Sequence, residues 1–354
     1  MALKGVVPAG GHGSRLRPIT HTTQKQLIPI ANKPLIFYVI EDLVSVGVEE
    51  IAVIVGPNKE RVKEAVGTGT RWGVDVRYIE QDEPRGLAHC VLISEPFVGQ
   101  DPFIMYLGDN LLIGGIHQMV KEFDGDASIM LTSVSNPSEF GVAVVDGKGG
   151  VKTLVEKPKD PPSDLILVGI YAFGPAIFEA ARKVSPSFRG ELEITDALQW
   201  LLEKGYRVQS SQVQGYWKDT GKPEDLLEGN RLVLDHVEAD LSLECPAGST
   251  VVGRGVLGEG ITILGGSVVR GPVALGKDVL IEDSYIGPYT SIGEGSVVRH
   301  TEIEHSILLE QVRIEGAGRL VDSIIGCEAV VRSRGDVRPV GKQLVVGDHS
   351  LIEL

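Results

Sequence analysis

Cysteine, aromatic residues and long apolar runs are all scarce in this sequence. Its three cysteines, Cys90, Cys245 and Cys327, lie far apart and form no CxxC pair. Neither a disulfide framework nor a zinc finger is therefore expected, and a reducing cytoplasm fits. Apolar runs such as Ile51–Val55 are far shorter than the roughly 18–20 residues that cross a bilayer. Because the first residues also contain no apolar signal-peptide stretch, we expect a cytoplasmic protein without membrane contact.

Acidic residues are absent from the first 40 positions, although the whole chain is acidic. The 354 residues carry a formal net charge of −14, which argues against a protein that binds duplex nucleic acid. Residues 1–40 contain five lysines and arginines but no aspartate or glutamate, and Glu41 is the first acid. A cationic stretch in an acidic protein suggests a small anionic ligand.

Strand patterns alternate with helical patterns over the first two-thirds of the chain. Strands are expected at Gly5–Pro8, Ile51–Val55, Val74–Glu80 and Phe103–Leu107, and with shorter connections at Ala127–Ser133, Gly141–Val145, Val151–Glu156 and Leu165–Phe173. Helices are expected at Pro34–Val46, Lys59–Val66, Leu87–Ser94, Pro175–Lys183, Ile194–Lys204 and Pro223–His236. The alternation predicts a parallel sheet covered by helices on both faces, with the later strands as a mixed extension.

Glycine becomes dense from about residue 241, and aliphatic residues recur there, mostly at every sixth position. The series is Val251, Leu257, Ile263, Val269, Leu275, Ile281, Ile286, Ile292, Val298, Leu308, Ile314, Leu320, Ile325, Val331 and Val337. A period of six fits neither a helix nor a flat strand, but it fits the hexapeptide repeat of a parallel β-helix. The sequence therefore predicts an α/β domain over residues 1–240 and a β-helix over residues 241–354.

A glycine-rich loop follows the first expected strand. Gly10, Gly11 and Gly13 would let backbone N–H groups approach a phosphate closely. The loop lacks the pattern GxxxxGK[ST], and Leu16 stands where a dinucleotide fingerprint needs its last glycine. A long polar loop is expected to continue to residue 33, and its cations are Arg15, Arg17, Lys25 and Lys33. Glycine amides combined with several fixed cations suit a nucleoside triphosphate.

A resemblance to a known family extends through nearly all of residues 1–235. The motifs that carry it are Gly10-Gly11-His12-Gly13-Ser14-Arg15-Leu16-Arg17-Pro18, Lys25-Gln26-Leu27-Ile28-Pro29-Ile30, Asn32-Lys33-Pro34, Gln81 with Gly86-Leu87-Ala88, Leu107-Gly108-Asp109-Asn110, Glu156-Lys157-Pro158, Gly169-Ile170-Tyr171, Gly190-Glu191-Leu192-Glu193-Ile194-Thr195-Asp196 and Trp217-Lys218-Asp219-Thr220-Gly221. In this order they resemble the signature of sugar-1-phosphate nucleotidylyltransferases, most of all glucose-1-phosphate thymidylyltransferases of the long form with a β-helix tail. Pro8 replaces the usual aliphatic residue and Ser14 the more usual threonine.

The resemblance implies both a fold and a reaction. The fold would be the Rossmann-like, doubly wound mixed sheet of the nucleotide-diphospho-sugar transferases, followed by a left-handed parallel β-helix. In the reaction, a sugar-1-phosphate oxygen attacks the α-phosphorus of a nucleoside triphosphate directly, and pyrophosphate leaves. Cations and a Mg²⁺ ion would reduce the repulsion between the two polyanions. The expected substrates are dTTP and glucose 1-phosphate, and the expected product is dTDP-glucose.

The resemblance also implies roles for individual residues. The catalytic residues would be Arg15 and Lys25, which grip the triphosphate, and Lys157, which holds the sugar phosphate. The nucleotide-binding residues would be Gly10, Gly11, Gly13, Gln81 and Gly86. The sugar-phosphate-binding residues would be Asp109, Gly141, Glu156, Lys157, Gly169 and Tyr171. Asp109 and Asp219 would hold Mg²⁺, which prefers hard oxygen ligands and needs few from the protein.

Several alternatives stay open. One is the same chemistry with UTP or with another sugar 1-phosphate. Gln81 can pair with the edge that thymine and uracil share, so UTP is expected as a slower substrate, because one methyl group discriminates by only about 1–3 kcal/mol. A non-catalytic homologue is less favoured, and so is an acyltransferase using His300, His305 or His349, since no acyl-coenzyme A signature accompanies these histidines. The β-helix is expected to serve homo-oligomerisation or effector binding. His12 is a further candidate for ligand contact.

Overall fold

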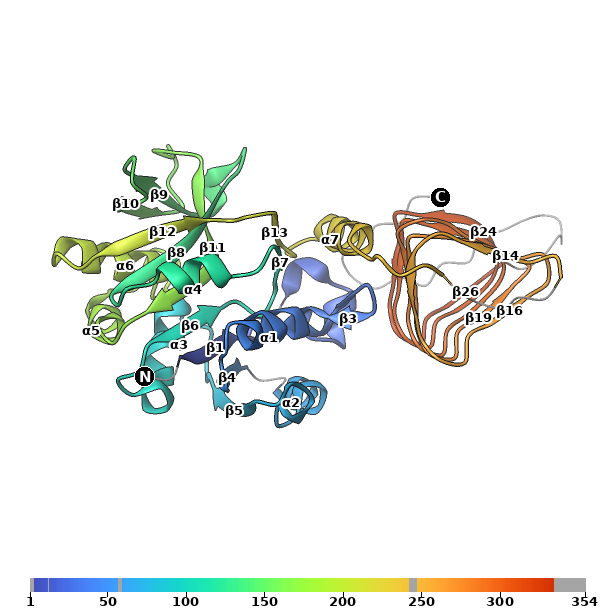
Figure 1. The fold of residues 1–354 in the computed structure, drawn as a ribbon, viewed down its shortest axis with the longest axis horizontal. Helices are drawn as coiled ribbons and strands as arrows, with labels where there is room; N and C mark the ends of the chain where they lie inside the picture. The colour runs from blue at the N-terminus through green and yellow to red at the C-terminus, as the bar shows by residue number, and fades with distance from the viewer. Residues whose placement is uncertain (1–2, 12, 57–58, 242–246, 334–354) are drawn as a thin grey trace. The chain divides into compact units, whose positions relative to one another are not determined.

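The computed structural model describes residues 3–11, 13–56, 59–241 and 247–333 (Figure 1). Contacts group the chain into two compact units. The first unit consists of Met1–His12, Gln24–Leu27 and Leu35–Asp219, and the second of Gly13–Thr23, Ile28–Pro34 and Thr220–Leu354. The second unit thus includes two short segments from near the N-terminus. Contacts do not show whether residues 1–240 fold by themselves, so the expected domain limit at residue 240 stays a prediction.

A nine-stranded mixed sheet lies at the centre of the first unit. Its strands are β1 (Lys4–Pro8), β4 (Glu50–Val55), β5 (Asp75–Glu80), β6 (Phe103–Tyr106), β8 (Ala127–Ser133), β9 (Gly141–Val145), β10 (Val151–Glu156), β11 (Leu165–Phe173) and β12 (Val208–Gln212). The order β5-β4-β1-β6 is parallel throughout, and antiparallel β11 then joins β6 to the remaining strands. This arrangement is the Rossmann-like parallel core with a mixed extension that the alternation predicts.

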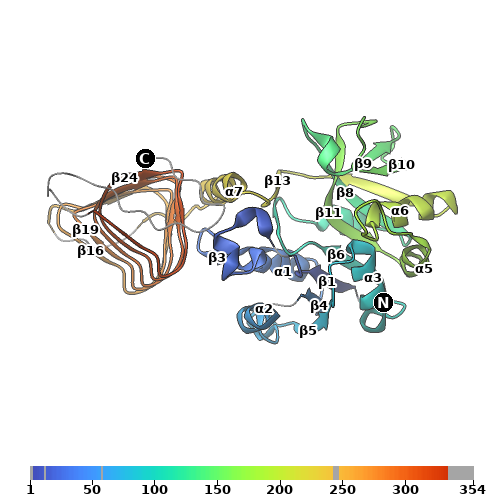
Figure 2. The ribbon, with the colours of Figure 1, turned by 180° about the vertical axis from the view of Figure 1, so that it is seen from behind.

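Helices cover both faces of this sheet, as Figure 1 and Figure 2 show from opposite sides. These helices of the first unit are α1 (Leu35–Ser45), α2 (Lys59–Val66), α3 (Leu87–Val98), α4 (His117–Glu122), α5 (Ala176–Lys183) and α6 (Ile194–Glu203). The second unit contains a separate helix, α7 (Pro223–Asp235). Val6 and Ile54 join the core beneath α3, α5 and α6, whereas Val7 and Val53 join the core beneath α1, α2 and α4. Neighbouring strand residues therefore alternate between two buried faces. No helix within the described ranges is long and apolar enough to cross a membrane.

Two expectations about the first helices need correction. Pro34 does not begin α1 but lies in β3 (Lys33–Pro34), which pairs with β2 (Pro29–Ile30) as a hairpin. α3 does not stop at Ser94 but continues through Pro96 to Val98, where the Gly99 N–H donates to the Glu95 carbonyl. The expected polar loop instead contains this hairpin and three short 3-10 helices, η1 (Ser14–Leu16), η2 (Ile19–His21) and η3 (Lys25–Leu27).

The β2–β3 hairpin is hydrogen-bonded to other parts of the second unit. Its two turn residues, Ala31 and Asn32, have φ angles of 48° and 62°, as a type I′ turn requires. The Ala31 N–H donates to Oδ1 of Asn230 on α7 at 2.8 Å, and Asn32 Nδ2 donates to the Ile292 carbonyl at 2.8 Å. Asn230 is fully buried and its Nδ2 donates to the Tyr289 carbonyl. The hairpin, α7 and the 289–292 segment therefore pack together.

Parallel sheets follow α7 in the second unit. Their strands are β14 (Thr250–Val252), β15 (Gly255–Leu257), β16 (Thr262–Leu264), β17 (Val268–Arg270), β18 (Val273–Leu275), β19 (Leu280–Glu282), β20 (Tyr285–Ile286), β21 (Thr290–Ile292), β22 (Val297–Glu304), β23 (Ile307–Leu308), β24 (Arg313–Val321), β25 (Ile324–Ile325) and β26 (Val330–Arg332). Val251 pairs with Val269 and Ile263 with Ile281, three six-residue steps further along. The periodic aliphatics up to Val331 lie in or against one apolar core, whereas Val337 is outside the described residues. This pattern fits a β-helix.

Candidate active site

The glycine-rich loop and the loop that carries Asp109 both start at the carboxyl edge of the central sheet. They follow the neighbouring strands β1 and β6, and the Gly108 N–H donates to the Pro8 carbonyl at 3.0 Å. From β1 the chain proceeds to β4 on one side, while β6 lies on the other side. Open α/β sheets bind ligands outside the strand ends where the order reverses in this way.

A two-stranded ribbon brings the two aspartates together. β7 (Asn110–Ile113) and β13 (Tyr216–Asp219) are antiparallel, and their register places Asp219 opposite Asn110, the residue after Asp109. Lys25 of η3 lies between the two carboxylates. Its Nζ is 2.7 Å from Asp109 Oδ2 and 3.0 Å from Asp219 Oδ1. Three residues that are far apart in the sequence therefore meet at one point.

Lys25 is the most buried member of this group. Its side chain is 7% exposed, compared with 26% for Asp109 and 31% for Asp219. Burial disfavours the ammonium, but the two carboxylates together outweigh it and raise the pKa of Lys25. Carboxylate oxygens that converge on one cation also suit a hard divalent ion, which would complete its shell with phosphate and water oxygens. The described residues contain no group of three or more His, Cys, Asp and Glu side chains that could form a closed protein cage.

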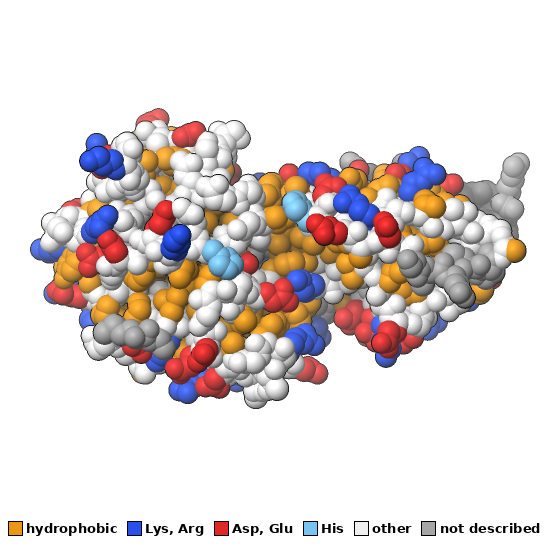
Figure 3. Space-filling model, in the orientation of Figure 1, with side chains coloured by type: hydrophobic (Ala, Val, Ile, Leu, Met, Phe, Trp, Pro, Cys, Tyr) orange, Lys and Arg blue, Asp and Glu red, His pale blue; other side chains and the backbone are white. Residues whose placement is uncertain are grey.

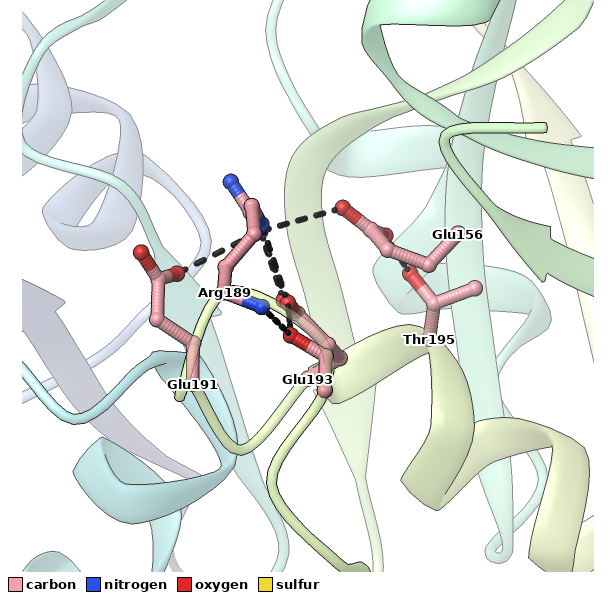
Figure 4. Close-up of polar contacts among 6 residues, drawn as sticks. Glu156, Arg189, Glu191, Glu193 and Thr195 are labelled. Carbon is pink, nitrogen blue, oxygen red and sulfur yellow. Dashed lines mark hydrogen bonds and ion pairs between the residues drawn. The ribbon is translucent and has the colours of Figure 1, made fainter. Parts of the chain in front are cut away.

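A second polar cluster surrounds Glu156 at the end of β10 (Figure 4). The Thr195 hydroxyl donates to Glu156 Oε2 at 2.6 Å. Arg189, in the loop before α6, lies 3.4 Å from Glu156 Oε1 and 3.3 Å from Glu191 Oε2. It also donates to both carboxylate oxygens of Glu193, at 2.8 and 2.9 Å. One guanidinium thus lies among three carboxylates.

Backbone geometry brings further predicted residues to Glu156. A Cβ on Gly141 would lie 2.6 Å from Thr195 Oγ1 and 3.1 Å from Glu156 Oε2, so a side chain there would displace Thr195 from Glu156. Lys157 has a φ of 40°, a conformation that non-glycine residues adopt at a cost and that is common at functional sites. Tyr171 is only 3% exposed, and burial followed by the nearby charge of Glu156 raises its pKa. It therefore supports the cluster from the core.

Gly169 joins the sheet to the Asp109 loop. Its φ is 82°, and a Cβ would lie 2.5 Å from Leu107 Cδ1 and 2.6 Å from Asn110 Nδ2. Its carbonyl accepts the Leu107 N–H at 3.0 Å. Glycine at this position therefore lets β11 approach the backbone that presents Asp109.

Gln81 lies directly after β5 and beside the glycine-rich loop. A Cβ on Gly10 would lie 3.5 Å from its Oε1, which leaves little space between them. Its Nε2 is 3.0 Å from Nδ1 of His89 in the first turn of α3. Gly86, the N-cap of α3, has a φ of 95°, and a Cβ there would lie 2.4 Å from the Leu192 carbonyl oxygen. This close approach permits the hydrogen bonds from Ala88 N–H to Leu192 and from Leu192 N–H to Arg85.

The remaining predicted residues lie elsewhere in the described chain or outside it. Gly11 is exposed within the glycine-rich loop. Gly13, with a φ of 58°, and Arg15, exposed on η1, belong to the second unit. The structure therefore groups Lys25 with the two aspartates, while the grip of Arg15 on the triphosphate stays a prediction. His12 lies outside the described residues.

Sequence reasoning assigned no role to three residues at the site. Gln26 is 2% exposed, lies beside Gly11 and Gly108, and has a buried Oε1 without a hydrogen-bond partner among the described residues, so this amide is available to a ligand. Buried Asn110 donates its amide N–H to the Val168 carbonyl beside Gly169. His89 contacts Gln81 across the turn. Gln26 and Asn110 belong to quoted motifs, which was a usable signal, whereas no sequence pattern indicated His89.

Comparison with known proteins places these features in a family. The sequence profile of the nucleotidyl transferase family matches residues 4–236. The chain is 47% identical to a glucose-1-phosphate thymidylyltransferase from Streptomyces griseus, and the match covers 99% of both chains. It is 48% identical to the low-salt glycan biosynthesis nucleotidyltransferase Agl11 from Haloferax volcanii, over 99% of this chain and 100% of that protein.

Solved structures agree with the sequence matches. The crystal structure of a UDP-glucose pyrophosphorylase complexed with UDP-glucose superposes with a TM-score of 0.61 at 30% identity, covering 66% of this chain and 99% of that one. The Rossmann-like fold of the nucleotide-diphospho-sugar transferases is therefore confirmed. With its glycine-rich loop, paired aspartates and full-length relatives, the chain belongs to the nucleotidyl transferase family.

Proposed function

We propose that the chain is a glucose-1-phosphate thymidylyltransferase, which forms dTDP-glucose and pyrophosphate from dTTP and glucose 1-phosphate. The observation that carries this proposal is the convergence of Asp109 and Asp219 on the buried ammonium of Lys25. Two polyanions repel each other, so a catalyst for their union needs fixed cations more than it needs a nucleophile. The name and 47% identity of the Streptomyces relative support the choice of substrates.

Each part of the site has a task in this reaction. Lys25 and Arg15 hold the triphosphate, and Lys157 holds the sugar phosphate so that its oxygen lies in line with the α-phosphorus. Glu156 accepts hydrogen bonds from sugar hydroxyls, and Gln81 pairs with the base. Asp109 and Asp219 would hold a divalent ion, for which we propose Mg²⁺; when bound, it would neutralise charge on the phosphate oxygens. Gln26 supplies an amide oxygen next to the glycine-rich loop.

A pyrophosphate-release assay with the four triphosphates, several sugar phosphates, and Mg²⁺ present or absent tests the proposal. We expect activity that requires the metal and is highest with dTTP and glucose 1-phosphate. Lys25→Ala should reduce turnover by about 10²–10³-fold, because one donor to the developing charge is lost. Lys4→Ala is the matched control: Lys4 also lies between two carboxylates and is 14% exposed, but it begins β1 at the opposite edge of the sheet. Equal rates for both variants would remove Lys25 from the mechanism.

UTP is the specific alternative to dTTP. The UDP-glucose pyrophosphorylase named above shares the fold, and uracil presents the same pairing edge to Gln81 as thymine. Discrimination then rests on the methyl group and the 2′-hydroxyl, so we expect UTP to be a slower substrate rather than an inactive one. If the chain were at least as active with UTP as with dTTP, it would be a uridylyltransferase instead.

For the second unit we propose a left-handed β-helix that associates with further copies of the chain. The six-residue aliphatic period and the parallel register support the β-helix. Exposed Val252, Val256, Val321 and Val330 support association, since apolar surface is buried in oligomers. Light scattering of the full chain tests it, and a monomer at micromolar concentration would contradict it.

A further inference from the structure

The side-chain amide of Gln81 has a donor half, Nε2, and an acceptor half, Oε1. In the structure the donor half already has a hydrogen-bond partner. Its Nε2 points to His89 Nδ1 at 3.0 Å. Its Oε1 lies on the side of Gly10. The donor half of the amide therefore faces α3, and the acceptor half faces the glycine-rich loop.

This orientation requires a particular form of His89. An amide NH₂ group can only donate, so the facing Nδ1 must be an acceptor, which makes His89 neutral with its proton on Nε2. The surroundings favour this form. Burial is the largest cause that lowers the pKa of His89, Arg85 adds to it, and Asp82 opposes it. The position in the first turn of α3 also disfavours a positive charge.

We propose that His89 is a positioning residue that determines which nucleobase Gln81 accepts, an inference that rests on the proposed function of the site. With neutral His89, Gln81 presents its carbonyl oxygen to the ligand. Thymine and uracil have an N3–H that donates to such an oxygen, whereas cytosine has an unprotonated N3 that would face it acceptor to acceptor. His89 thus selects the bases that carry an N3 proton, although it does not contact the base itself.

Protonation of His89 would reverse this selection. Nδ1 then becomes a donor, so the Gln81 amide must turn its oxygen to His89 and its NH₂ group to the ligand, which suits the N3 of cytosine. The other charged groups around His89 do not share this contact. Arg85 and Asp82 pair with each other at 2.7 Å. The loop that packs against α3 through Leu192 carries three further charged residues, and there Arg189 pairs with Glu191 and Glu193.

Equilibrium binding of dTTP and dCTP, measured by titration calorimetry of the full chain with Mg²⁺, tests the proposal without requiring turnover. The two ligands share the sugar and the phosphates, so the ratio of their dissociation constants isolates the base. We expect the wild-type preference for dTTP to fall by about 10-fold or more as the pH drops through the titration of His89, since one hydrogen bond to the base then becomes mismatched. His89→Leu should show a low, pH-independent ratio.

Two further variants separate positioning from a general structural role. His89→Asp places near Nδ1 a carboxylate that can only accept when it is ionised, so it should restore the preference for dTTP across the pH range in which His89 titrates. His117→Leu, at an exposed histidine that begins α4, should behave as the wild type. Equal weakening of dTTP and dCTP by His89→Leu, or an unchanged ratio, would overturn the proposal. Selective binding without pyrophosphate release would contradict only the proposed function.

Discussion

Glu156 combines burial with a network of opposing charges. Burial raises its pKa above the ordinary glutamate value, and Glu193 adds to the rise. The hydrogen bond from Thr195, with Lys157 and Arg189, acts in the opposite direction. Because the ionised form is disfavoured, acidification protonates Glu156 at a higher pH than an exposed glutamate. Only the ionised carboxylate accepts hydrogen bonds at both oxygens, so its protonation should weaken sugar binding.

Thr195→Val therefore should move the acid limb of activity to higher pH. The change removes the hydroxyl that favours ionised Glu156, so the pKa of Glu156 rises further and the KM for glucose 1-phosphate should increase several-fold under mildly acidic conditions. A pH profile of kcat/KM measures this. Thr195→Ser retains the hydroxyl and should follow the wild type. Since titration of the substrate is common to all three proteins, identical acid limbs would refute the role of Thr195.

For individual residues, the sequence motifs indicated which residues lie close together better than which atoms they contact. The resemblance pointed to Lys25, Asp109 and Asp219, and the structure brings them within hydrogen-bonding distance. It did not indicate that Lys25 lies between the two carboxylates, because that follows from the register of β7 and β13. The contact from Gln81 to His89 depends on a turn whose path is set by Leu192.

The two ends of α3 differ in what surrounds their glycines. Gly86 and Gly99 flank the helix with φ angles of 95° and 68°. A Cβ on Gly86 would meet the Leu192 backbone at 2.4 Å, whereas a Cβ on Gly99 would meet nothing within 4 Å. Both positions disfavour a side chain through the backbone angle, but only Gly86 also has a steric conflict with another segment.

Gly86→Ala and Gly99→Ala form a matched pair. Gly99→Ala should cost about 1–3 kcal/mol of stability from backbone strain alone and leave activity unchanged. Gly86→Ala should cost more and also lower kcat/KM, because the displaced Leu192 segment carries Arg189 and Glu193. Thermal unfolding and steady-state kinetics of the two variants compare these effects. Equal losses of stability with full activity in both would contradict the steric argument.

Elements with strong periodic patterns were predictable. The strands Ala127–Ser133, Gly141–Val145, Val151–Glu156 and Leu165–Phe173 form with the expected bounds. The six-residue period anticipated the apolar core of the second unit. α4, β12, β13 and the β2–β3 hairpin were missed. They are short or polar. The pairing of β12 and β13 also depends on partners distant in sequence, whereas β2 and β3 form a local two-residue pair on each side of a turn.

Charge at the scale of the whole chain is dispersed. The net charge is −14, yet on the face drawn in Figure 3 acidic and basic side chains are interspersed. Most of the ion pairs in the described parts of both units join partly exposed side chains and contribute little to stability. The Lys25 group, with its buried ammonium, is an exception, so added salt should affect ligand binding more than folding.

A fragment that ends at residue 240 should be less stable than the full chain. It keeps α7 and the β2–β3 hairpin but lacks Tyr289 and Ser291, which hydrogen-bond the fully buried Asn230. It also exposes Leu234, which packs against Ala274. We expect a lower melting temperature and faster proteolysis within residues 220–240. A fragment with the same melting temperature and cleavage pattern as the full chain would establish residue 240 as an independent domain limit.

The hydrogen bond from the Ala31 amide to Asn230 has a consequence for the exchange of protons with solvent. Amides in surface turns normally exchange with deuterium through small local openings. This amide donates at 2.8 Å to a side chain with no solvent exposure, which is held in turn by the backbone at Tyr289. Deuterium would therefore reach Ala31 only when the hairpin separates from α7, which makes one turn near the start of the chain a reporter on its contact with a helix about 200 residues later in the sequence.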